Sequence, residues 1–194
     1  GMMKTKEDAL VAGAMFHIFS EKGEEQMFNS DLNKLSQESR DFIKKVMNES
    51  LDESEVDEFL SKSSEKGEIA ETILNLTTLL EKTKNQILLF TCMYLVEFEE
   101  VRSHIKKNCI GHWEEPLVIN RSIKGEQLLR MWELCSYRYR QTYGTSVRKY
   151  GKNKNAPTEL LNILFDFDND EPLRRSIAFN PQLDRDLSLK FMNS

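Results

Sequence analysis

The chain has 194 residues, of which 39% are hydrophobic and 30% charged, and its net charge is −5. This length and composition are typical of a globular protein with one main core rather than of a disordered or fibrous chain. Only eight glycines and four prolines interrupt the sequence, which favours helices over a strand-and-turn architecture. The longest apolar run, 87–96, is about half as long as a membrane-spanning helix, so we expect no membrane partner.

Helical signals occur from the first residues onward. Apolar side chains between residues 6 and 22 form one wide face, and Gly23 is a typical helix stop. Ser36 is a typical N-cap for a helix with Phe42, Ile43 and Val46 on one face. A short helix capped by Asp52 or Ser54 is expected next, within the strongly acidic stretch 49–71.

The strongest periodicity in the chain lies between residues 69 and 101, where apolar residues recur every three or four positions. It predicts one long core helix over 67–108, or two helices with a break near 81–86. The same stripe could instead form the seam of a homodimer. A second long helix is expected over 124–143, and its face carries Leu128, Trp132 and Tyr139. Gly144 is a candidate stop, and a further turn at 146–150 completes the second arm of the hairpin, 124–150. We expect Trp132 to pack against the 87–98 part of the stripe.

The C-terminal part begins with a short helix at 158–165. Beyond it, Pro172 and Pro181 exclude one continuous helix. The sequence therefore predicts an all-α, multi-helix bundle with a long central helical hairpin and an irregular C-terminal arm. Its domain division is a helical domain at 2–170 and a partly extended arm at 171–194, with one short helix at 184–192. No internal repeat is evident.

Positive charge is concentrated in one segment. Residues 121–154 hold nine Lys/Arg and two Glu, a charge of +7, so the remainder of the chain carries −12. Four of the five tyrosines lie there, and Tyr139 and Tyr143 fall on the expected buried face. Tyr137 is expected to be exposed and Tyr150 could also be. The predicted contact surface comprises Arg130, Tyr137, Arg138, Arg140, Arg148, Lys149, Lys152 and Lys154.

Such a surface faces an anionic group, for which the sequence leaves four alternatives, unless the face is simply solvated. The group can be an acidic protein, a phosphorylated ligand, a nucleic acid whose phosphates bind Lys/Arg while its bases stack on tyrosine, or the chain's own acidic stretch 49–71. The leading interpretation is a non-enzymatic interaction or regulatory protein. A nucleic-acid-binding protein using the same residues is the alternative.

Motifs for catalysis and metal binding are weak. His104, Cys109 and His112 lie close in sequence, and Cys92 precedes them, but no fourth zinc ligand has a suitable spacing. Cys109 and His112 could also act as nucleophile and base in an enzyme with a site at 104–112. The Glu100–His104 spacing and the Asp166–Asp168–Asp170 series match di-iron and calcium motifs only in part. We therefore predict no cofactor and no metal. Three unpatterned cysteines indicate a reducing, cytoplasmic location.

Overall fold

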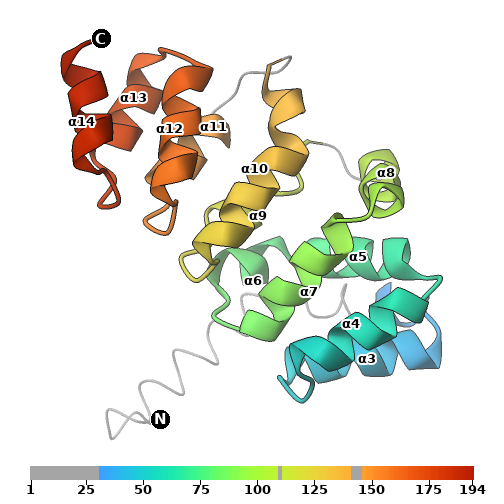
Figure 1. The fold of residues 1–194 in the computed structure, drawn as a ribbon. Coiled ribbons are helices and arrows are strands. Elements are labelled where there is room, and N and C mark those ends of the chain that lie inside the picture. Colours follow the sequence, from blue (N-terminus) through green and yellow to red (C-terminus); the bar gives the residue numbers. More distant parts are fainter. Residues whose placement is uncertain (1–30, 109–110, 141–145) are drawn as a thin grey trace, which may run out of the picture.

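The computed structural model describes residues 31–108, 111–140 and 146–194, and all regular secondary structure within them is helical (Figure 1). The all-α class predicted from the sequence is confirmed. The helices are α3 (Gln37–Met47), α4 (Glu53–Lys62), α5 (Lys66–Leu74), α6 (Thr77–Lys82), α7 (Gln86–Val96), α8 (Glu99–Asn108), α9 (Glu115–Val118), α10 (Gly125–Tyr139), α11 (Ser146–Lys152), α12 (Thr158–Phe167), α13 (Glu171–Ala178) and α14 (Arg185–Met192).

The predicted long helices are each divided. Residues 67–108 form α5, α6, α7 and α8, with one break at 83–85, where the sequence had allowed it, and two that were not expected. The Asn85 side chain caps α7 by accepting from the backbone N–H of Leu88 at 2.9 Å. At the end of α7, the Arg102 guanidinium donates to the carbonyls of Val96 and Glu97, which satisfies acceptors that a helix end leaves free. The segment 124–150 contains α10 and α11, a division that the sequence had allowed, and there is no long hairpin within the described residues.

The predicted irregular arm is also corrected, because residues 171–194 form two helices that belong to the packed structure. Pro172 occupies the first turn of α13. Backbone N–H groups in the first turn of a helix have no partner within the helix, so the N–H that proline lacks costs no helical hydrogen bond. Asp170 caps this helix by accepting from the N–H of Leu173 at 2.9 Å. The short helix expected at 184–192 is confirmed as α14, capped by Asp184. The helix expected at 6–22 lies outside the described residues.

The second half of the chain is built from stacked helix pairs, as in an α-solenoid (Figure 1). Helix α6 contacts α9, α9 contacts α11, and α11 contacts α13, so these four form one row. Helices α7, α10, α12 and α14 each follow one member of that row through a short turn and make up the second row. The chain therefore has an internal structural repeat, although no repeat is evident in its sequence.

A chain of hydrogen bonds between the turns, called here the amide ladder, joins successive helix pairs. Each ladder amide donates to two backbone carbonyls of the preceding turn. Asn120 donates to the carbonyls of Leu80 (2.6 Å) and Thr83 (3.0 Å). Asn153 donates to Val118 (2.7 Å) and Asn120 (2.9 Å), and Asn180 donates to Gly151 and Asn153 (both 2.8 Å).

The four turns share a local geometry as well. The side-chain oxygens of Thr83, Asn120, Asn153 and Asn180 each accept from the backbone N–H two residues later, at 2.7–3.1 Å. The residue three positions before each ladder position is fully buried; these residues are Leu80, Leu117, Tyr150 and Ile177. Asn85 extends the series backward by donating to the carbonyls of Val46 and Met47 in α3. The ladder therefore holds the turns along one edge of the molecule.

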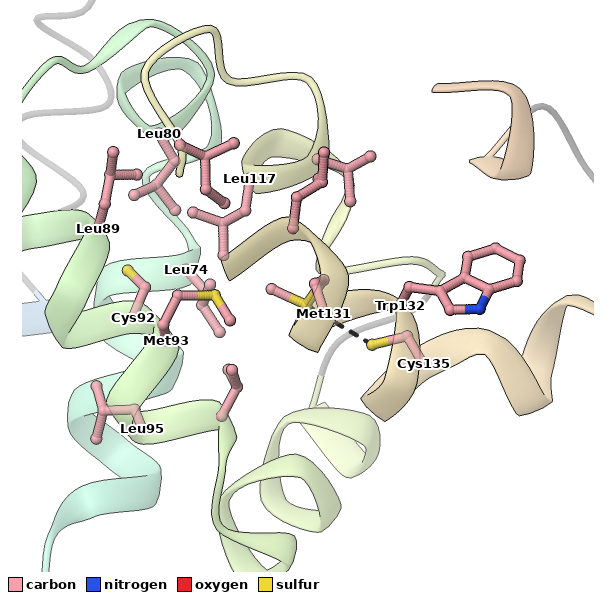
Figure 2. Packing of buried hydrophobic residues seen from close by; sticks show 14 of the residues in the cluster. Leu74, Leu80, Leu89, Cys92, Met93, Leu95, Leu117, Met131, Trp132 and Cys135 are labelled. Carbon is pink, nitrogen blue, oxygen red and sulfur yellow. Dashed lines mark hydrogen bonds between the residues drawn. The ribbon is translucent and has the colours of Figure 1, made fainter. Parts of the chain in front are cut away.

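The core runs continuously through both halves, and Figure 2 shows its centre. Met131 lies on the side of α10 that faces Met93 of α7, whereas Trp132 points away from α7. The ring of Trp132 packs against Tyr139, Tyr150 and Phe167, with centroids 5.1–5.6 Å apart. The expected packing of Trp132 against the 87–98 stripe is therefore wrong: Trp132 packs against rings of α10, α11 and α12, and Met131 takes the side of α10 that faces α7.

Candidate interaction surface

The predicted contact residues fall into two sets, and the first set is paired with carboxylates of the same chain. Arg130 binds Glu97, the C-cap of α7, and Glu133 one turn along α10. Arg148 of α11 binds Asp170, the cap of α13, at 3.1 Å. Lys149 binds Glu115 of α9 at 2.7 Å. These pairs join neighbouring helix pairs and neutralise much of the basic face.

Arg138 belongs to the same set, at the edge of a buried polar cluster. Its guanidinium lies 2.8 Å from a carboxylate oxygen of Glu114, which is 1% exposed. The other carboxylate oxygen of Glu114 accepts a hydrogen bond from the Tyr139 hydroxyl at 2.7 Å. The Tyr139 hydroxyl is in turn 2.9 Å from the Tyr150 hydroxyl. Tyr150 is fully buried, so of the two tyrosines that the sequence allowed to be exposed only Tyr137 is. Tyr143 lies outside the described residues.

Burial has a clear electrostatic effect on this cluster. Desolvation is the main reason why the pKa values of Tyr139 and Tyr150 are raised well above their ordinary value. Desolvation is the largest single effect on Arg138 and would lower its pKa, but the charges and hydrogen bonds of Glu114 and Cys135 together raise the pKa above its ordinary value. The cluster therefore contains neutral phenols around a buried ion pair, which suits a structural role between α9, α10 and α11.

The second set of predicted residues is open to solvent. Tyr137 is 59% exposed. Arg140 is also exposed, and its guanidinium lies 5.9 Å from the ring centroid of Phe167. Lys152, the last residue of α11, and Lys154, in the turn after it, are exposed on either side of Asn153. None of these three cations pairs with a carboxylate within the part of the chain that the structure describes.

The acidic stretch 49–71 does not cover this surface. Among the described residues, one ion pair links it to the basic segment, between Glu53 and Lys124 at 3.9 Å, and both side chains are about half exposed. The carboxylates that pair with the predicted residues come instead from α9 and α10 and from the caps of α7, α9 and α13. Internal neutralisation is therefore partial, and it involves helix neighbours rather than the acidic N-terminal stretch.

The proposed enzyme site at 104–112 is not assembled by the described residues. His104 packs over Gly67 and its Nε2 lies 2.7 Å from a carboxylate oxygen of Glu71. His112 lies instead beside Glu114 and the ring of Tyr139. Cys109 lies outside the described residues. No group of three or more potential metal ligands occurs among the residues for which the structure gives positions.

The apolar stripe at 69–101 is largely used within the chain. Ile69, Ile73, Leu80 and Val101 are fully buried in the core of a single chain. Dimerisation through the stripe stays a prediction, and it would have to use the half-buried rings of 90–98. None of the described helices is both long enough and apolar enough to cross a membrane.

Sequence reasoning missed the turns as part of the surface. Lys82, Lys84 and Arg121 are exposed cations in the turns before Lys152 and Lys154. Lys82 and Lys84 precede the basic segment 121–154 in the sequence. The stacking of the turns is what places them in line with the cations of that segment. Comparisons with protein-family models, with curated proteins and with solved structures gave no match to this chain.

Proposed function

We propose that this chain is a non-enzymatic interaction protein that binds an anionic macromolecular partner along its stacked helix pairs. Stacked repeats offer an extended surface that can contact a partner over several turns. The contact residues proposed from the predicted set are those open to solvent: Tyr137, Arg140, Lys152 and Lys154.

The observation that carries this proposal is the division of the basic segment into paired and unpaired cations. Arg130, Arg138, Arg148 and Lys149 have carboxylate neighbours in the same chain. An exposed ion pair adds little attraction for a third charge, because the partner would first have to displace the carboxylate. The exposed cations without such neighbours are therefore the ones available to an anionic partner.

A cytoplasmic location is part of the proposal. Cys92 and Cys135 are free and buried, and burial raises the pKa of each thiol to about 12. Buried thiols of this kind are unreactive side chains of a core, as in proteins of reducing compartments. Fractionation of cells that express the chain would test the location directly.

The binding test uses fluorescence anisotropy at 50 mM salt with two labelled probes, an oligoglutamate peptide and a single-stranded oligonucleotide. We expect at least one probe to bind with a Kd between about 1 and 100 µM. The triple variant Arg140→Gln, Lys152→Gln, Lys154→Gln should weaken that binding about 10-fold or more.

The matched control is Lys106→Gln with Lys107→Gln. Both lysines are exposed in the last turn of α8, away from the stacked turns. This control should leave the affinity within twofold of the original chain. If neither probe binds at 50 mM salt, or if control and triple variant weaken binding equally, the proposed function is wrong.

A further inference from the structure

The unpaired positive charge of this protein is organised by the amide ladder. Lys82 and Lys84 flank the first ladder position, Thr83. Arg121 follows Asn120, and Lys152 and Lys154 flank Asn153. These five residues are called here the turn-edge cations: Lys82, Lys84, Arg121, Lys152 and Lys154. All five are exposed.

The ladder hydrogen bonds place these residues side by side in space. The amide of Asn120 reaches the carbonyl of Thr83, and the amide of Asn153 reaches the carbonyl of Asn120. Asn155 donates in turn to the carbonyl of Arg121 at 2.9 Å, which joins the backbone beside Lys154 to the preceding turn. With helix axes 8–10 Å apart, the four stacked turns extend over about 24 to 30 Å. The cations therefore form a row along one edge rather than scattered surface charges.

Acidic residues do not neutralise this row. Within 31–108, 111–140 and 146–194, no ion pair joins a carboxylate to any turn-edge cation. The carbonyl oxygens of the turns accept from ladder amides, so they are also occupied. Glu81, next to Lys82, is half-buried. The edge is consequently positive although the whole chain is negative.

The row ends at a hollow that contains an exposed aromatic ring. This hollow has a volume of about 400 Å³, and Lys152 of the row lines it. Arg175 of α13 and two residues of the turn after α13, Phe179 and Pro181, line it as well, and no carboxylate is among its lining residues. Phe179 is 81% exposed, and it precedes the ladder residue Asn180 as Lys152 precedes Asn153. A large ring at this position contributes little to the core and is open to a planar ligand.

We infer that the turn edge binds single-stranded nucleic acid, with the turn-edge cations contacting phosphates and Phe179 stacking on a base. Each nucleotide supplies both an anionic phosphate and an aromatic face, which are the two chemistries that this edge offers together. An acidic peptide would use the cations and leave Phe179 without a planar partner. The inference deepens the proposed function and rests on it, and it extends the contact residues beyond the segment 121–154.

The test measures binding of a labelled 20-nucleotide single-stranded DNA by anisotropy between 50 and 200 mM salt. Five phosphate contacts predict a slope of log K against log salt of about −3.5, which corresponds to about 100-fold weaker binding over this range. Lys152→Gln with Lys154→Gln should reduce the slope by about 1.4. Lys82→Gln with Lys84→Gln should do the same, although these residues lie outside the basic segment.

Phe179→Ala separates stacking from charge. Loss of one stacked base predicts about 5- to 150-fold weaker binding with an unchanged salt slope. Since Phe179 is mostly exposed, the thermal unfolding midpoint should not fall. The control Lys106→Gln with Lys107→Gln should change neither slope nor affinity.

The outcomes distinguish this inference from the proposed function. If the oligoglutamate peptide binds and the oligonucleotide does not, the proposed function stands and the inference is overturned. If the oligonucleotide binds but Lys82→Gln with Lys84→Gln and Phe179→Ala have no effect, the turn edge is not the site and the inference is again overturned. If neither probe binds, both fall.

Discussion

Removing the amide of Asn153 should cost a large part of the stability of this protein. Asn153 is 7% exposed and lies in the middle of the ladder. Its Nδ2 donates to the carbonyls of Val118 and Asn120, and its Oδ1 accepts from the N–H of Asn155. The variant Asn153→Ala removes all three bonds and leaves two buried carbonyls without this donor.

The magnitude follows from the number of bonds. Three hydrogen bonds at about 1 kcal/mol each give a loss of about 3 kcal/mol in the free energy of unfolding. If water does not reach the two carbonyls, their desolvation raises the loss toward about 4 kcal/mol or more. This is a substantial fraction of the roughly 5–15 kcal/mol that stabilises a typical domain.

Urea unfolding followed by circular dichroism measures this loss. Asn153→Asp is the informative second variant, because a carboxylate has nearly the same size as the amide but cannot donate to the two carbonyls. It should be at least as destabilising as Asn153→Ala at neutral pH. The exposed Asn169 provides a control, since Asn169→Ala should change the free energy of unfolding by less than about 0.5 kcal/mol. A loss at Asn153 no larger than at Asn169 would refute the reasoning that the ladder holds the turns together.

Two further predictions concern the packed interfaces between helix pairs. Burial raises the pKa values of Tyr139 and Tyr150 in the folded chain, so their contribution to the free energy of unfolding is fully present below the unfolded tyrosine pKa of about 10 and should be lost as the pH rises above it. Absorbance at 295 nm should show that these two phenols ionise only when the chain unfolds. Ionisation before unfolding would contradict their burial. Gly151→Ala should destabilise the chain by about 1–3 kcal/mol, because the new Cβ would lie 2.5 Å from the Oγ of Ser176. Adding Ser176→Ala should restore most of that loss in a urea titration, and no recovery would show that the crowding lies elsewhere.

The sequence predicted helix type and burial well but helix ends poorly. The 69–101 stripe was recognised as core because burial produces the same three- and four-residue spacing whether or not the helix is interrupted. The breaks at 75–76 and 97–98 leave little local signal, since the first has no side-chain cap and the second depends on Arg102 bonding to Val96 and Glu97. Tertiary contacts set these ends.

The candidate surface was predicted in part for a similar reason. Composition located the positive segment, but it could not show that Arg138 faces Glu114 or that Arg148 faces Asp170. The structural repeat was missed because a single Asn or Thr marks each turn, and these residues are separated by 37, 33 and 27 positions. The sequence does carry one sign of the repeat. Four times, a buried apolar residue stands three positions before a polar turn residue.

The unequal spacing of the ladder positions shows how this architecture tolerates changes in chain length. Each ladder contact needs only a few residues around one turn. Whether 37, 33 or 27 residues separate it from the preceding one, the amide donates to the carbonyl of the preceding ladder position and to a second carbonyl two or three residues before that position. Insertions and deletions can therefore accumulate where a helix pair connects to the next pair without shifting the ladder. A repeat of this kind keeps one edge constant while the opposite edge is free to diversify.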